Sequence, residues 1–133
     1  MKKGIYCLVI RVNRDISVHI GALELRRFAE GYYIYVGSAQ NNLDKRIQRH
    51  LASEKRIHWH IDRLLAEPSA EIVGVFYKAA AKEHECSTAS RLMILGQPEK
   101  DFGSSDCACK SHLIRMFHYD KFPFPDFFEY PPD

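Results

Sequence analysis

The segment at residues 4–12, GIYCLVIRV, constrains the fold more than any other part of the chain. Its side chains are mostly apolar, with β-branched and aromatic members, and only one arginine interrupts them near the end. Such a run predicts a strand in the core of a sheet. The two lysines before it superficially resemble a secretory signal, but the apolar run is short and no small-residue cleavage site follows.

Further elements follow from periodicity and from turn residues. The residues NRD at 13–15 predict a turn, after which residues 16–25 pair back on the first strand as a hairpin. Leu43, Ile47 and Leu51 recur every four residues and predict a helix over 43–53. The remaining predicted elements are strands at 32–36, 71–77 and 111–117 and helices at 57–66 and 83–95.

The chain of 133 residues fits one domain, which we place at residues 1–121. Residues 122–133, FPFPDFFEYPPD, contain too much proline for a helix or a central strand and too many aromatics for a solvated linker. We expect this tail to lie extended on the domain or on a partner chain. No stretch is long and apolar enough to span a membrane, so we expect no membrane partner.

The net charge of +2 permits a nucleic-acid partner without demanding one. Four cysteines without a signal peptide indicate a reducing, cytoplasmic location, where thiols are more often metal ligands or buried packing than disulfides.

The triplets GIY at 4–6 and YVG at 35–37 are followed by a helix that carries Leu43, Arg46 and His50. With the later Glu85, this ordered set resembles the GIY-YIG endonuclease superfamily over roughly residues 4–95. The stretches HWHID at 58–62 and FGSSDCACKSHL at 102–113 resemble a little-characterised subgroup of it. The resemblance implies an α+β fold with a small, mainly antiparallel β-sheet flanked by helices.

The resemblance also implies hydrolysis of a phosphodiester with one divalent metal ion. Glu85 would hold Mg²⁺ or Mn²⁺, which would neutralise the leaving 3′ oxygen. Tyr6 would help to activate the attacking water, which requires the metal or nearby cations to depress its pKa. Tyr35 would position water or phosphate, while Arg46 and His50 would stabilise the transition state.

The residues themselves support part of this scheme. Arg46 and His50 are four residues apart and therefore share one face of the helix, beside the apolar stripe. A planar guanidinium grips phosphate with two hydrogen bonds, and an imidazole passes a proton near neutral pH. The alternative is a solvated helix flank, with Tyr6 as a simple core aromatic.

Glu85 falls inside the apolar arc of its helix, in contrast to Glu83, which shares the direction of serines. A carboxylate aimed at a core is costly unless it is paired or bound to a cation, so Glu85 is the better metal ligand of the two. The alternative is an ordinary first-turn acid that the helix dipole favours.

A basic segment with one tryptophan predicts contacts to nucleic acid. The predicted contact residues are Gly37 of the second triplet and, from the basic segment, Lys45, Arg49, Lys55, Arg56 and Trp59. The alternative places Trp59 in the core and the charges in solvent. His58 and His60 would share a metal only in an extended segment, and His58 with Asp62 would form a hydrogen-bonded pair in a helix.

Three cysteines and a histidine define a second candidate metal site. Cys107, Cys109 and His112 form C-x-C-x-x-H, to which Cys86 would add a fourth ligand for a structural Zn²⁺. Buried free cysteines are the competing interpretation.

We therefore expect a metal-dependent DNA endonuclease, structure-specific or repair-related, with RNA as an open alternative. In most members of the superfamily the two triplets are closer together, and many carry a late asparagine, whereas this chain has asparagine only at 13, 41 and 42. Two other functions follow from such departures: an inactive nucleic-acid-binding module, or a zinc-stabilised interaction domain. The oligomeric state is left open.

Overall fold

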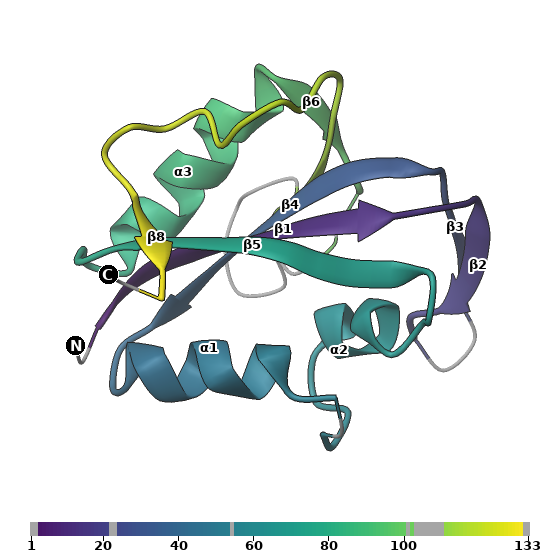
Figure 1. The fold of residues 1–133 in the computed structure, drawn as a ribbon, viewed down its shortest axis with the longest axis horizontal. Coiled ribbons are helices and arrows are strands. Elements are labelled where there is room, and N and C mark those ends of the chain that lie inside the picture. The colour runs from purple at the N-terminus through teal and green to yellow at the C-terminus, as the bar shows by residue number, and fades with distance from the viewer. Residues whose placement is uncertain (1–2, 22–23, 54, 101, 103–110, 132–133) are drawn as a thin grey trace.

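The predicted α+β fold, a small antiparallel sheet flanked by helices, is confirmed in the computed structural model (Figure 1). The structure describes residues 3–21, 24–53, 55–100, 102 and 111–131. The strands of the main sheet, all antiparallel to their neighbours, are in order β6 (Gly96–Pro98), β7 (Leu113–Met116), β4 (Gly31–Ala39), β1 (Gly4–Val12), β5 (Ala70–Lys78) and β8 (Phe128–Tyr130).

Strand β1 is central in the sheet, and its side chains are buried on both faces. It pairs with β4 on one side and β5 on the other, so that Tyr6 lies opposite Gly37 and Tyr77. Side chains alternate between faces along a strand. Accordingly Tyr6 joins one apolar cluster, while its neighbours Ile5 and Cys7 join the other. The near-continuous apolar run of the sequence is explained by this double burial.

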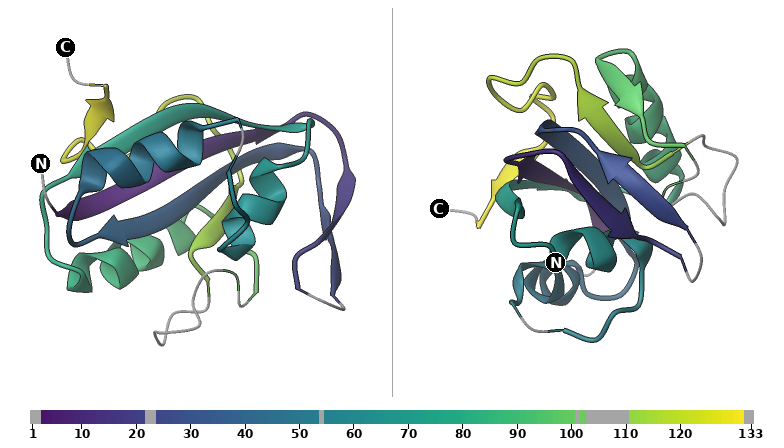
Figure 2. Two further views of the ribbon diagram at one scale, coloured as in Figure 1. Left: turned by 90° about the horizontal axis from the view of Figure 1, so that it is seen from below. Right: turned by 90° about the vertical axis from the view of Figure 1, so that its right-hand side faces the viewer.

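The two faces of the sheet are covered by different helices. Helices α1 (Leu43–Leu51) and α2 (His60–Leu65) pack on the Tyr6 face, whereas α3 (Glu83–Met93) packs on the opposite face (Figure 2). Among the described residues, no helix is long and apolar enough to cross a membrane.

The predicted hairpin partner of the first strand is wrong. Strand β2 (Ile16–His19) pairs with β3 (Leu25–Phe28) in a separate two-stranded sheet, not with β1. Both edges of β1 are taken by the longer strands β4 and β5, which bury more apolar surface against it. The hairpin therefore closes on itself through the turn that contains Gly21.

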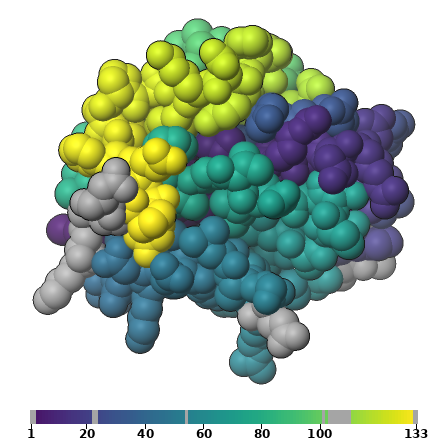
Figure 3. Space-filling model, viewed as in Figure 1, coloured from purple at the N-terminus to yellow at the C-terminus, as the bar shows by residue number. Residues whose placement is uncertain are grey.

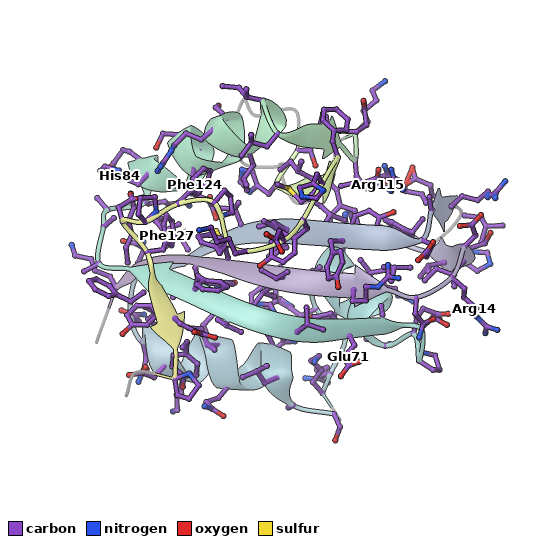
Figure 4. The ribbon with its side chains drawn as sticks, turned by 45° about the horizontal axis from the view of Figure 1, so that its top comes forward. Arg14, Glu71, His84, Arg115, Phe124 and Phe127 are labelled. Atoms are coloured by element: carbon purple, nitrogen blue, oxygen red, sulfur yellow. The ribbon has the colours of Figure 1, made fainter. Side chains whose placement is uncertain are left out.

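The tail lies on the domain. Strand β8 pairs with β5, and the hydroxyl of Tyr130 accepts a hydrogen bond from Gln48 of α1 at 2.7 Å. Phe124 and Phe127 are buried in the cluster on the α3 face (Figure 4). In the space-filling view the tail, in yellow, lies beside β5 and reaches α1 (Figure 3).

Candidate active site

A polar pocket of about 1100 Å³ collects side chains from β1, β4, α1, α3 and the segment before α2. Its lining residues are Tyr6, Tyr35, Gly37, Ser38, Gln40, Asn41, Asn42, Lys45, Arg46, Arg49, His58, Trp59, His60, Lys82 and Glu85. Four of the five predicted catalytic residues are in this set. The fifth, His50, is hydrogen-bonded to one of them.

Residues from both faces of the sheet reach this pocket because strand pairing beside β4 is short. Strand β7 pairs with β4 only from Tyr33 to Tyr35, whereas β4 continues to Ala39. The last part of β4 therefore has α1 on one side and the start of α3 on the other. Tyr6 and Tyr35 come from the α1 face, and Glu85 comes from the first turn of α3.

Tyr6 and His50 form a buried hydrogen-bonded pair. The Tyr6 hydroxyl lies 2.7 Å from His50 Nε2, and each residue is only 2 % exposed. Burial lowers the pKa of His50 from 6.5 to about 4, because a charged imidazolium is poorly solvated there. The neutral ring accepts the hydrogen bond of the Tyr6 hydroxyl at Nε2 and carries its own proton on Nδ1. Among the described residues Nδ1 has no hydrogen-bond partner.

Burial also raises the pKa of Tyr6 above its usual value, and that of Tyr35 likewise. The positive charge of Arg46 acts in the opposite direction on both phenols but is outweighed by burial. A phenol that acts as a base near neutral pH needs a metal or nearby cations to depress its pKa. The cations alone do not achieve this, so a Tyr6 base needs a proton acceptor, and His50 is in contact with it.

The position of the Tyr6 ring explains why the second triplet ends in glycine, at position 37. A Cβ atom at position 37 would lie 2.4 Å from the hydroxyl oxygen and from Cζ of Tyr6, well inside van der Waals contact. The ring of Tyr6 thus occupies the space that a side chain on β4 would fill. Tyr6 can therefore take this position only because residue 37 has no side chain.

Arg46 is held at the pocket by two contacts. Its Nη1 donates to the carbonyl of Ser38 at 3.0 Å, and its guanidinium carbon lies 4.7 Å from the centre of the Trp59 ring. Helix α1 begins at Leu43, with Asn42 as N-cap accepting the Lys45 N–H at 3.0 Å. The cap fixes the helix start and so places Arg46 one turn into α1, facing the pocket.

Asp62 is fully buried and organises the segment before α2. Its carboxylate accepts both Nη1 and Nη2 of Arg49, at 3.1 and 3.0 Å. It also accepts the backbone N–H groups of His58 and Trp59, each at 2.9 Å. These bonds, led by the one to Arg49, hold the pKa of Asp62 below its usual value although burial opposes them. The prediction that Asp62 pairs with the ring of His58 inside a helix is wrong: His58 precedes α2, and the carboxylate accepts the backbone N–H of His58.

Glu85 faces the pocket from the first turn of α3, with its side chain 15 % exposed. Its Oε2 atom lies 4.0 Å from Nδ1 of the buried His112, whose Nε2 lies 3.8 Å from the sulfur of Cys86. Glu83, two residues earlier, is exposed and does not line the pocket. The distinction that the sequence predicted between these two acids is present in the structure.

The predicted nucleic-acid contacts divide into two groups. Gly37, Lys45, Arg49 and Trp59 line the pocket, whereas Lys55 and Arg56 do not. Lys55 donates instead to the carbonyls of His50 and Ala52, both at 2.8 Å, at the end of α1. The carbonyl of Arg56 accepts Nη2 of Arg49 at 2.6 Å.

Several pocket residues were not predicted. Ser38 lies near the end of β4, Gln40, Asn41 and Asn42 connect β4 to α1, and Lys82 immediately precedes α3. The N-capping pattern before Leu43 is the one sequence signal that points to this loop. His58 and His60 were considered only as metal ligands or structural partners, yet both line the pocket.

The proposed zinc ligands lie partly outside the described residues. Cys86 and His112 are 3.8 Å apart, whereas Cys107 and Cys109 are not in the described ranges. Within those ranges, no three His, Cys, Asp or Glu side chains are grouped as a metal site. Magnesium is commonly bound by one or two carboxylates with water and substrate phosphate, so a single Glu85 in a polar pocket fits that mode.

The chain belongs to the family described as Domain of unknown function DUF123, whose model matches residues 5–123. The match includes β1 from Ile5 onwards, the helices α1, α2 and α3, and every residue that lines the pocket. Neither the curated proteins nor the solved structures contain a match.

Proposed function

We propose that the protein is a divalent-metal-dependent endonuclease of the GIY-YIG type that hydrolyses phosphodiester bonds of DNA in the cytoplasm. One observation carries the proposal. Tyr6, Tyr35, Arg46 and Glu85 line one pocket, with His50 bonded to Tyr6, although these residues come from four separate elements. A phenol and a neutral imidazole can transfer protons, a guanidinium can stabilise charge on phosphate, and a carboxylate can hold a metal ion, so the set is suited to phosphodiester hydrolysis.

In this proposal Tyr6 and His50 act as a unit in activating water. Tyr6 takes a proton from the attacking water as it passes its own proton to Nε2 of His50. The water oxygen forms the new bond to phosphorus, and the bond from phosphorus to the 3′ oxygen breaks. Burial keeps His50 neutral at pH 7, so the lone pair of Nε2 faces Tyr6, and the same lowered pKa makes the ring a weaker base than a solvated histidine.

Arg46 would bind the non-bridging phosphate oxygens as charge increases on them. Its bond to the Ser38 carbonyl and its contact with Trp59 hold the guanidinium in place before substrate binds. Tyr35, which lines the same pocket, would position the phosphate or the water.

Glu85 would hold the Mg²⁺ or Mn²⁺ ion, with water and substrate as the other ligands. When bound, such an ion supplies charge neutralisation at the leaving oxygen. Lys45, Arg49 and Lys82 add positive charge around the pocket, where the phosphates of the strand would lie.

The decisive test uses two acids from one turn of α3. Purified protein is incubated with DNA duplexes, single strands, flaps and junctions in the presence of Mg²⁺ or Mn²⁺, with EDTA as a control. We expect cleavage that EDTA stops and that Glu85→Gln reduces at least about a hundredfold. The matched variant Glu83→Gln should cleave like the wild type, because Glu83 is exposed and outside the pocket.

Cleavage that survives Glu85→Gln, or none on any substrate with either metal, would refute the proposal. In the second case, salt-sensitive DNA binding would identify an inactive binding module. A bound zinc ion without DNA affinity would identify the interaction domain.

A further inference from the structure

Three consecutive residues before and at the start of α2, His58, Trp59 and His60, line the same pocket as the proposed catalytic groups. We call them the aromatic wall. His58 and His60 are exposed and Trp59 is half-buried, so the rings present surface to the pocket as well as to the core. This wall is the part of the pocket that phosphate chemistry does not use.

The aromatic wall is held rigidly by Asp62. The buried carboxylate takes the backbone N–H groups of both His58 and Trp59, so the chain cannot rotate these residues without losing two bonds. The rings of His58 and Trp59 are in edge contact, with centres 4.7 Å apart. A preorganised surface of this kind loses little conformational entropy when a ligand binds.

Two planar cations lie over the ring of Trp59 and add their own planes to the aromatic wall. The guanidinium carbons of Arg46 and Arg49 lie 4.7 and 4.4 Å from the centre of the Trp59 ring. Nucleobases stack both on aromatic side chains and on guanidinium planes. The pocket therefore contains a composite stacking surface immediately beside the arginine that would hold the phosphate.

A base inside a duplex cannot use such a surface, because its two faces are already stacked on its neighbours. An unpaired base offers both faces, and a pocket of about 1100 Å³ has room for a nucleotide together with its phosphates. The geometry favours a strand whose base next to the reacting phosphate is out of a duplex.

We infer that the aromatic wall is a subsite for an unpaired nucleobase adjacent to the scissile phosphate. The substrate class would then be single-stranded DNA, or the single-stranded portion of a branched DNA. This inference rests on the proposed function and narrows its substrate. Its test is a binding measurement, so that it can fail or succeed separately from cleavage.

Trp59 is the only tryptophan of the chain and provides the signal. The Glu85→Gln protein, in EDTA, is titrated with a short mixed-sequence DNA strand, with its blunt duplex, and with the same strand carrying abasic positions. We expect the intact strand to quench Trp59 fluorescence and to bind at least about fivefold more tightly than either comparison ligand, since each stacked base contributes to affinity. Equal affinity for the intact and abasic strands, or no quenching, would overturn the inference.

Two substitutions of Trp59 repeat the binding test. Because they remove the tryptophan signal, binding is followed with a labelled DNA strand. Trp59→Phe keeps a stacking ring and should bind within about twofold of the parent, whereas Trp59→Leu should lose about fivefold or more. Thermal melting by circular dichroism checks that both are folded, and the fluorescence titration decides the matter should Trp59→Leu fail to fold.

Cleavage distinguishes the two proposals. Metal-dependent cleavage of duplex and single strand at equal rates would leave the nuclease proposal intact and refute the subsite. Quenching by the single strand, without cleavage of any substrate by the wild type, would support the subsite and refute the nuclease.

Discussion

The two faces of the sheet are built differently. On the α1–α2 face, the buried groups include a phenol–imidazole pair, Tyr6 and His50, and the carboxylate of Asp62, which is paired with the half-buried Arg49. On the α3 face, the tail adds stacked rings, with Phe76 and Phe122 centred 4.2 Å apart, beside the buried Phe124 and Phe127. The ion pairs that accompany this aromatic layer involve Asp126, which is at the surface.

This difference indicates a division of labour. Burying apolar side chains stabilises a fold. Burying polar or charged side chains costs free energy unless their hydrogen bonds and ion pairs are formed. The Tyr6–His50 pair and the Asp62 carboxylate lie beside the pocket, and the tail contributes apolar burial on the other side. The following experiments test this division, from the largest expected effect to the smallest.

The largest effect is expected on the α1–α2 face. Asp62→Ala removes the carboxylate and leaves the Arg49 guanidinium and two backbone N–H groups without their partner. We expect the free energy of unfolding in urea to fall by about 3–5 kcal/mol. The exposed Asp120→Ala is the matched control and should stay near the wild type. A loss below about 1 kcal/mol for Asp62→Ala would show that the buried pair is not structural.

On the opposite face, Phe124→Ala should lower the free energy of unfolding by about 3 kcal/mol, because it empties a buried position in the aromatic layer. The rate of DNA cleavage per folded molecule should be unchanged, since Phe124 does not line the pocket. Phe128→Ala is the control within the tail: its side chain is 65 % exposed, and we expect little change. A variant that is stable but inactive would break the proposed division.

The pH dependence of stability should report on His50. Its pKa is lowered from 6.5 to about 4 in the folded protein, so between these values the unfolded chain binds a proton that the folded chain does not. Stability is therefore complete above pH 6.5 and falls as the pH drops towards 4, by about 3 kcal/mol in total. Urea titrations of wild type and His50→Gln at several pH values measure this, and parallel curves for the two proteins would contradict the assignment.

The smallest effect is expected at Asp126. Arg91 and then Lys78 hold the pKa of its carboxyl below the usual range, yet the side chain is 45 % exposed and water screens these pairs. Asp126→Asn should change the free energy of unfolding by less than about 1 kcal/mol at neutral pH. The measurement is the same urea titration, and a loss comparable to that of Asp62→Ala would remove the contrast between surface and buried pairs.

Local patterns predicted those parts of the fold in which each residue's role depends on its near neighbours. The apolar run at 4–12 and the stripe of Leu43 and Ile47 coincide with β1 and α1. The spacing of Arg46 and His50 also predicted a shared direction, and both side chains do face the Tyr6 side.

Predictions that depended on distant partners were weaker. The helix predicted at 57–66 begins only at His60, because Asp62 takes the N–H groups before it. The partner of β2 was wrong because periodicity describes one strand and not the competition for its edges. The contribution of Lys82, Ser38 and the loop at 40–42 to the pocket follows from where β7 stops, which no local pattern encodes.

The space left by Gly37 has an evolutionary corollary. Any side chain at that position would displace the phenol across the ladder, so positions 6 and 37 cannot vary independently. Among homologues, a larger residue at 37 should be found only where position 6 has lost its ring. The two triplets, distant in the chain, would then be inherited or discarded together.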